Sequence, residues 1–253
     1  KVAKAKKNPR LVKNLVTKDF NIRETTSEAW LTFEQLNNPA TFDIAELKPS
    51  YAIGGADLSS TTDLTCATLM FMIKDNSQIY VLQMYWIPED LLERRESEDR
   101  VPYTLWKEQG WLRTCPGNQI DYKYIVEWFV EMQNEHGIYL SFFGYDAWSA
   151  VYFIQDMITN FGDYGMEKVI QGKYTLSAPM KSLGADLEAK IINYNNNPIL
   201  KWCLSNTSID VDRNDNIQPS KGKSQTRRID GAASLLDAYV AFSRHREEYL
   251  NLI

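Results

Sequence analysis

A chain of 253 residues, 44% of them hydrophobic and seven of them tryptophan, has enough apolar surface for one substantial domain with its own core. Modest glycine and proline contents exclude fibrous and low-complexity architectures, and no apolar run is long enough to span a bilayer. A net charge of −5 argues against a dedicated high-affinity nucleic-acid binder, but not against an enzyme that contacts DNA only at a local site.

The first 45 residues are polar and irregular in pattern, and we expect them to form a linker or docking segment. A helix-like stretch occurs at 27–36, where aromatic and apolar residues recur at helical spacing. The basic cluster at 1–13 is followed by no apolar segment, so it does not read as a signal peptide. Because the chain starts with Lys rather than Met, we expect a piece of a longer polypeptide, with residues 1–45 leading into a main domain at 46–253.

Three strands are expected next along the chain: 51–56, 65–73 and 78–86. The first is rich in small apolar residues, ends at Asp57 and precedes a hydroxyl-rich turn at 59–62. The other two flank a polar turn at 75–77, which is typical of a hairpin. The charged stretch 88–109 is expected to be helical or loop-like, and a short strand is expected at 111–114.

The second half of the chain alternates between helices and strands. The clearest helix is 121–135, which has one apolar stripe and Gly137 at the position of a C-terminal cap. The other expected elements are a strand at 138–145 with Asp146 at its exit, a helix at 147–161, a strand at 168–171, a helix at 182–194, extended segments at 202–211 and 217–218, and a closing helix at 228–248. This order predicts an α/β fold in which helices flank a mixed central sheet.

Three aspartates stand where a metal site could form. Asp57 and Asp146 each end a predicted strand, and ligand sites in open α/β sheets gather at the carboxyl ends of strands. Asp230 lies on the first turn of the closing helix. Two strand-end carboxylates and one helix carboxylate can hold two divalent metals, which activate a water and stabilise the leaving oxygen in phosphodiester hydrolysis.

The cysteines and histidines are too few and too widely spaced to suggest a metal site built from them. The three cysteines, Cys66, Cys115 and Cys203, are odd in number and far apart in sequence, and the two histidines are His136 and His245. These numbers argue against a disulfide scaffold and a zinc centre. Carboxylate oxygens remain, and they select Mg²⁺ or Mn²⁺.

Simpler interpretations of these carboxylates stay open. A single strand-end aspartate is more often a turn former than a ligand, and Asp230 could be a favourable charge near a helix N-terminus. Asp63 could cap the hydroxyl-rich turn or lie at the site. Asp237 follows Asp230 by close to two helical turns, so the two carboxylates share a face. Either or both could line the site, and Asp237 could also be a partly exposed helix charge.

A polar, basic loop leads into the closing helix. It contains Lys221 and Lys223 and is followed by Arg227 and Arg228. A solvated loop is the simplest interpretation, and the functional alternative is that these four residues hold a DNA backbone beside the metals. The loop lacks the GxxxxGK[ST] pattern, which occurs nowhere in the chain, so we expect no ATP hydrolysis from it.

The acidic motifs also resemble a known family. The segment AIGGADLSSTTDLT at 52–65 looks like the first nuclease motif of the large terminase subunits of tailed phages. The pieces similar to that family's closing block are 202–206, 216–219, Lys221, 223–224 and 228–232. Weaker similarities occur at 29–31, 145–146, 171–172 and 176–180.

This resemblance implies an RNase H-like fold of the retroviral integrase superfamily, with Asp57, Asp146 and Asp230 as the metal ligands. It implies an endonuclease that cuts concatemeric double-stranded viral DNA at the start and end of packaging, in the host cell cytoplasm at the procapsid and not at a membrane. The implied partners are an upstream ATPase domain, the small terminase subunit and the portal protein. Asp237 departs from the family pattern, where we expect an apolar residue, and this keeps the third ligand open.

Two alternatives remain. The same carboxylates would serve a Holliday-junction resolvase or a transposase-like nuclease of the same fold, although a remnant of an upstream domain at 1–37 favours a terminase. The second alternative is a non-catalytic module of a packaging motor that binds DNA, portal or capsid. Such a module would show no stabilisation by divalent metals, and Asp57→Ala would leave its function intact.

Overall fold

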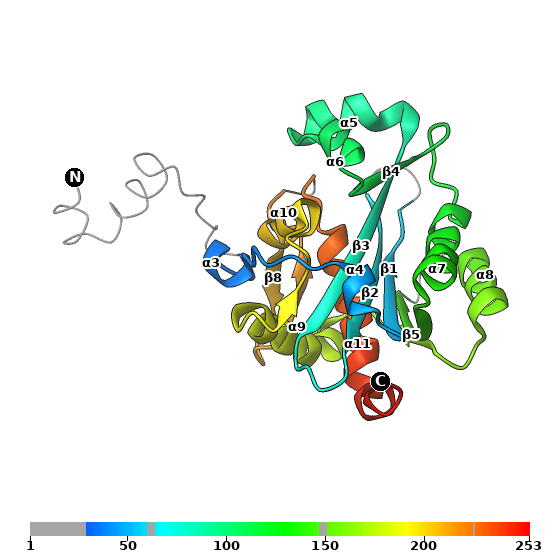
Figure 1. Ribbon diagram of the computed structural model, residues 1–253. Helices are drawn as coiled ribbons and strands as arrows, with labels where there is room; N and C mark the ends of the chain where they lie inside the picture. The colour runs from blue at the N-terminus through cyan, green and yellow to red at the C-terminus, as the bar shows by residue number, and fades with distance from the viewer. Residues whose placement is uncertain (1–28, 60–63, 147–150, 225) are drawn as a thin grey trace.

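The computed structural model describes residues 29–59, 64–146, 151–224 and 226–253, and its centre is a mixed β-sheet (Figure 1). The strands are β1 (Tyr51–Asp57), β2 (Thr65–Met72), β3 (Ile79–Pro88), β4 (Leu112–Cys115), β5 (Tyr139–Asp146), β6 (Met166–Val169) and β7 (Ile192–Asn193). Their order is β4-β3-β2-β1-β5-β6, with β7 beside β3. β1, β2 and β3 are antiparallel neighbours, whereas β5 runs parallel to both β1 and β6, so the predicted mixed α/β fold is confirmed.

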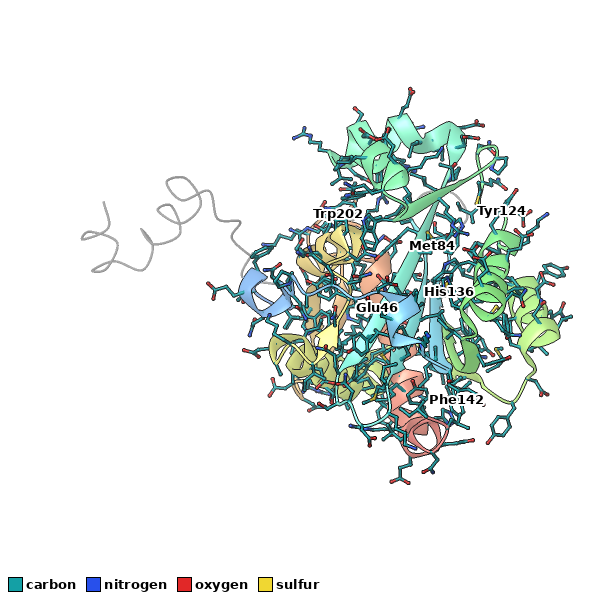
Figure 2. The ribbon with its side chains drawn as sticks, in the orientation of Figure 1. Glu46, Met84, Tyr124, His136, Phe142 and Trp202 are labelled. Atoms are coloured by element: carbon teal, nitrogen blue, oxygen red, sulfur yellow. The ribbon has the colours of Figure 1, made fainter. Side chains whose placement is uncertain are left out.

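Helices cover both faces of this sheet (Figure 1). The two layers are α9 (Lys173–Glu188) with α11 (Asp230–Leu250), and α7 (Lys123–His136) with α8 (Val151–Phe161). Each layer has its own hydrophobic cluster, one containing Leu236 of α11 and the other Phe129 of α7. In Figure 2, Trp202 and Tyr124 lie on opposite sides of the sheet. Because both faces are covered, all 8 residues of β2 are buried, and its sequence is nearly all apolar instead of alternating.

Smaller elements surround these layers. They are α3 (Phe33–Leu36), α4 (Ile44–Leu47), the 3-10 helix η2 (Glu89–Leu91), α5 (Leu92–Asp99), α6 (Tyr103–Glu108), α10 (Pro198–Asn206) and the antiparallel hairpin of β8 (Ser208–Val211) and β9 (Ile217–Ser220). The charged stretch after β3 is thus mostly helical. In the ranges that the structure describes, no helix has the length and apolar character needed to cross a membrane.

Most predicted elements are present with small shifts at their ends. The predicted hairpin is β2 and β3, and the clearest predicted helix is α7, which ends at Gly137 with a left-handed φ of 68°. The next predicted helix corresponds to α8, although residues 147–150, which include Trp148, lie outside the described ranges.

Two predicted elements were wrong. The helix expected at 182–194 is α9, which begins nine residues earlier, at Lys173, and contains Pro179 in its interior. A proline inside a helix is unfavourable, but here buried residues such as Leu176 and Leu183 hold the helix on the core. The first part of the segment expected to be extended from 202 is instead α10. Its start was missed because the cap lies upstream, where Asn197 accepts hydrogen bonds from Ile199 N and Leu200 N.

Residues 29–45 pack against the domain, so the predicted boundary at residue 45 does not coincide with a break in packing. Leu31 and Leu36 belong to the core cluster that also contains α9 and α11. The backbone N–H of the buried Asn38 donates a hydrogen bond to the Tyr194 hydroxyl at 2.8 Å, which ties this segment to the core. The helix expected at 27–36 shortens to α3, which starts with a capping box at Thr32. Residues 1–28, with the basic cluster, lie outside the described ranges.

Candidate active site

Asp57 and Asp146 end two neighbouring strands. β1 ends at Asp57 and β5 ends at Asp146, as predicted from the sequence. The two strands are parallel, and Ala56 pairs with Tyr145, so the aspartates follow adjacent positions in the register. Neighbouring strands lie about 4.8 Å apart. Both carboxylates therefore start from the same edge of the sheet, called the carboxyl edge below.

Helix α11 brings its first residue, Asp230, to the same edge. The Tyr249 hydroxyl near the end of α11 donates to Tyr51 O at the start of β1, at 3.1 Å. The Ser234 hydroxyl near the beginning of α11 donates to Gly55 O near the end of β1, at 3.2 Å. The helix therefore runs opposite to β1, and its N-terminus lies at the carboxyl edge.

The same helix crosses the sheet diagonally. Along the helix, Gly231 lies against Tyr85 of β3, Ser234 bonds to Thr68 of β2, and Asp237 approaches Gly144 of β5. Farther along, Arg244 forms an ion pair with Glu167 of β6. The order of these contacts is the order of strands in the sheet. As a result Asp230 lies toward β2 and β3, while Asp237 lies toward β5 and β6.

Two glycines allow α11 to lie directly on the strand backbones. A Cβ on Gly55 would be 2.5 Å from Ser234 O and 2.6 Å from Ala238 N. A Cβ on Gly144 would overlap the backbone carbonyl of Asp237. These contacts involve backbone atoms, which cannot rotate away as a side chain could.

Gly144→Ala is expected to lower the free energy of unfolding by about 3 kcal/mol, the upper end of the usual range for an overpacked core, because α11 must shift. Urea denaturation of the parent and the variant measures this difference. The matched control is Gly184→Ala in α9, whose new Cβ would be 3.3 Å from a side-chain atom, Trp30 Nε1. Alanine is favoured over glycine in a helix, so this control should be close to neutral. Equal stability of Gly144→Ala and the parent would contradict the close packing of α11 on β5.

A buried polar network fixes the first turn of α11. Gln83 Nε2 donates to Gly231 O and to Thr68 Oγ1, both at 2.8 Å. The Tyr85 hydroxyl donates to Gln83 Oε1, and the Thr68 and Ser234 hydroxyls are 2.7 Å apart. Sequence reasoning missed these residues. The available signal was a pair of polar residues, Thr68 and Gln83, facing each other across two otherwise apolar strands.

The charges of Asp57 and Asp230 act on the same buried groups. Burial raises the pKa of the Cys66 thiol, and the nearby carboxylates of Asp57 and Asp230 raise it further. The pKa of the Cys203 thiol is raised by burial and by the same two carboxylates. Asp57 and Asp230 therefore both lie near these two thiols, although they are far apart in sequence.

The side chain of Asp237 has an environment of its own. Its carboxyl group is buried and accepts a hydrogen bond from Gln171 Nε2 at 3.1 Å. Burial raises its pKa to about 8; the hydrogen bond from Gln171 lowers the pKa, and the nearby Asp146 raises it. The prediction that Asp237 could be a partly exposed helix charge is wrong, because its exposed fraction is 3%.

The four carboxylates provide hard oxygen donors of the kind that Mg²⁺ and Mn²⁺ prefer. In the described part of the chain, no three side chains of Asp, Glu, His or Cys lie close enough together to hold a metal ion. Asp63, the other candidate, lies outside the described ranges.

The four basic residues of the predicted DNA contact have different surroundings. Lys221 and Lys223 lie between β9 and α11, and Lys223 is exposed. Arg227 is partly buried and donates to Ser208 Oγ at 3.1 Å. Arg228 is buried, and its guanidinium pairs with Asp99 at 2.9 Å, so the predicted contact of Arg228 with DNA is corrected to a structural role.

Known proteins share this sequence pattern and this fold. The family described as "Terminase large subunit, endonuclease domain" matches residues 1–246. The large terminase subunit of Enterobacteria phage HK97 is 28% identical over 181 residues, which cover 72% of this chain and 35% of that protein. The chain therefore spans about a third of the length of this relative.

Two solved structures extend the comparison. The crystal structure of the HK97 bacteriophage large terminase matches with a TM-score of 0.72 at 24% identity, over 94% of this chain and 49% of that one. The large terminase nuclease from thermophilic phage G20c, crystallised with bound magnesium, matches with a TM-score of 0.51 at 10% identity, over 85% of this chain and 97% of that one. These matches agree with the predicted RNase H-like fold.

Proposed function

The chain belongs to the family of the terminase large subunit endonuclease domain, and from this premise we propose that it cuts concatemeric double-stranded viral DNA when packaging starts and ends. The observation that supports this most is the position of Asp57 and Asp146 at adjoining strand ends, with the N-terminus of α11 at the same edge. Acidic groups gathered at one edge of a sheet suit phosphodiester hydrolysis, which needs cations between the carboxylates and the phosphate.

We propose that Asp57, Asp146 and Asp230 hold two Mg²⁺ or Mn²⁺ ions. The magnesium in the G20c nuclease is consistent with a hard cation in this fold. When bound, such a pair supplies an activated water and stabilises the leaving oxygen. Asp230 is the better third ligand because it starts α11 at the carboxyl edge, whereas the carbonyl of Asp237 lies over Gly144, two residues before the end of β5.

The loop between β9 and α11 is the proposed contact to the DNA backbone. Lys221, Lys223 and Arg227 supply positive charge just before the residue that would bind metal, Asp230. Phosphate contacts of this kind fix the register of DNA and carry no sequence information. Since the chain has a net charge of −5, DNA binding by this chain is expected to be weak and sensitive to salt.

In the full-length protein, this domain is proposed to work with an upstream ATPase domain. The proposed partners of the whole protein are the small terminase subunit and the portal protein of the procapsid. The proposed place of action is the host cell cytoplasm.

Cleavage of supercoiled plasmid at low salt tests the proposed activity. The parent chain is incubated with Mn²⁺, with Mg²⁺ or with EDTA, and products are separated as nicked, linear and supercoiled forms. Nicking and linearisation in either metal, and none in EDTA, are expected. If the chain neither cuts in any condition nor gains thermal stability from the metals, a module that only binds DNA or portal becomes the better explanation.

Asp230→Asn is expected to abolish cleavage, whereas Asp237→Asn is expected to keep about a tenth to a hundredth of it. An amide at position 237 can still accept the hydrogen bond from Gln171, and the loss of an outer partner of a metal site typically costs about 10- to 100-fold. The same plasmid assay, with initial rates in Mn²⁺, measures both variants. The reverse result, with Asp230→Asn active and Asp237→Asn inactive, would assign the third ligand to Asp237.

A further inference from the structure

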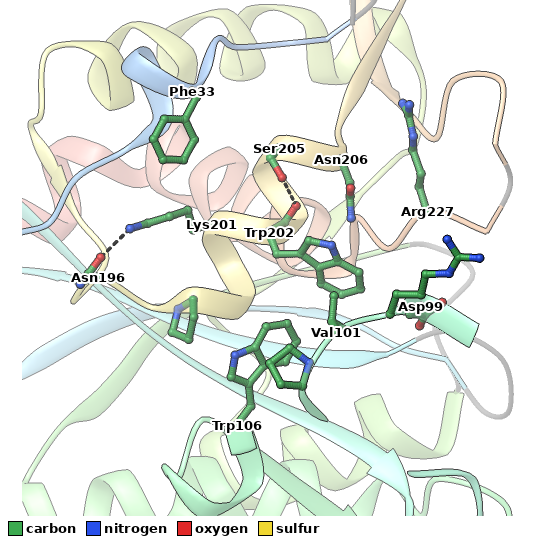
Figure 3. Close-up of a pocket in the computed structure, with 13 residues that line it drawn as sticks. Phe33, Asp99, Val101, Trp106, Asn196, Lys201, Trp202, Ser205, Asn206 and Arg227 are labelled. Atoms are coloured by element: carbon green, nitrogen blue, oxygen red, sulfur yellow. Dashed lines mark hydrogen bonds between the residues drawn. The ribbon is translucent and has the colours of Figure 1, made fainter. Parts of the chain in front are cut away.

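A groove of about 730 Å³ lies beside the start of α11 (Figure 3). One wall is formed by α6, which contributes Trp106, and by the turn before it, which contributes Arg100. The opposite wall is α10, which contributes Lys201 and Trp202, and Arg227 lines the groove just before α11. The groove is distinct from the carboxyl edge, since none of the four candidate metal ligands lines it.

Trp202 forms an aromatic surface in this groove. Its indole packs on Trp106, with ring centroids 5.7 Å apart, and on the edge of Tyr103 at 6.1 Å. These contacts fix the position of the ring, and the partly buried Trp202 lines the groove together with Trp106. A ring fixed in this way can stack on a flat ligand with little loss of side-chain freedom.

Three cations line the same groove as this ring, although the chain as a whole is acidic. In Figure 3, the Lys201 amine points toward Asn196 and the Arg227 guanidinium points away from the Trp202 indole, so both charges lie along the groove at a distance from the ring. The Lys201 amine donates to Asn196 Oδ1 at 2.6 Å, which keeps it at the wall of the groove. Arg100 is the third cation. Asp99 is the acidic residue among the described residues of the lining, and it is paired with Arg228, so these residues together carry net positive charge.

We propose that this groove binds one or two unpaired nucleotides of a DNA strand, with a base stacked on Trp202 and phosphates held by Lys201, Arg227 and Arg100. Aromatic rings between cations are the pattern that binds single strands without sequence preference. The volume is that of a pocket for a small organic ligand, far too small for a duplex. The choice of DNA as the bound nucleic acid rests on the proposed function. Arg227 belongs both to the groove and to the proposed contact with the DNA backbone.

The test measures binding of a fluorescently labelled tetrathymidylate by anisotropy in EDTA, so that metal plays no part. Trp202→Ala is expected to weaken binding about fivefold or more, the effect of losing one stacked base, and Trp202→Phe is expected to bind nearly as well as the parent. Lys201→Gln is expected to weaken binding and to lower the salt dependence by about one phosphate contact. The matched control is Lys123→Gln, at an exposed lysine on α7.

The same anisotropy measurement on Asp57→Asn separates the proposal for this groove from the proposal for the nuclease site. Three results together support the groove, even if no plasmid is cut. Tetrathymidylate binding should persist in Asp57→Asn, should be weakened by Lys201→Gln and should not be competed by a short blunt duplex. Binding that is lost in Asp57→Asn but unchanged in Trp202→Ala and Lys201→Gln overturns the groove and leaves the nuclease intact. Absence of binding by the parent also overturns it. Melting curves show whether Trp202→Ala is folded, and Lys201→Gln decides the question if it is not.

Discussion

Asp57→Asn is expected to remove metal-dependent plasmid cleavage while leaving the protein folded. Asp57 ends β1, a strand with β2 on one side and β5 on the other, so its carboxylate lies at the middle of the carboxyl edge. The amide has the same shape but no negative charge, and a hard divalent cation binds it more weakly. The loss should exceed the roughly 10- to 100-fold typical of residues that only support a metal ligand.

Two measurements check this expectation. Initial rates of plasmid nicking in Mn²⁺ give the loss of activity, and the rise in Tm on adding Mn²⁺ gives the loss of metal binding, because a ligand that binds only the folded state raises Tm. Asp156→Asn, an exposed aspartate on α8, is the matched control and should behave as the parent in both. If Asp57→Asn cuts at the parental rate, the site lies elsewhere and the alternative of a purely structural aspartate is correct.

The sequence was sufficient for those parts of the site that depend on local pattern. Asp57 and Asp146 could be placed at strand ends because each closes a short apolar run. The parallel pairing of their strands was not predicted, because β2, β3 and β4 lie between β1 and β5 in the sequence. The first turn of the closing helix was also predictable, because Asp230 precedes a long stretch with helical spacing of apolar residues.

The parts that could not be predicted depend on residues that meet only after folding. Asp99 and Arg228 are 129 residues apart in sequence, and each alone resembles a solvated surface charge. The same holds for Gln83 and Gly231, which are 148 residues apart. Nothing local indicates that α11 lies diagonally across five strands, yet this diagonal decides that Asp230 and Asp237 approach opposite sides of the site.

Arg228→Ala is expected to be among the most destabilising single changes in the chain. The side chains of Arg228 and Asp99 are 6% and 5% exposed, and Arg228 Nε and Nη2 donate to the two carboxylate oxygens at 2.9 and 3.2 Å. The Tyr103 hydroxyl also donates to Asp99, at 2.8 Å. Removing Arg228 leaves a buried carboxylate without its counter-charge, which costs about 3–5 kcal/mol. This corresponds to a fall in Tm of roughly 6–20 °C, measurable by calorimetry.

A double variant separates the loss of the charge pair from the exposure of one buried charge. Arg228→Met combined with Asp99→Leu fills a similar volume without charge, and such replacements are often neutral or stabilising, so the double variant should recover most of the lost Tm. If it melts as low as Arg228→Ala, the ion pair itself stabilises the fold, and the uncompensated charge does not explain the loss. Since Asn206 Nδ2 also donates to Arg228 O at 3.1 Å, the backbone two residues before Asp230 stays anchored in both variants. Plasmid cleavage by the double variant should therefore persist, because we expect Arg228 to act on the stability of this region, whereas the proposed metal ligand is Asp230.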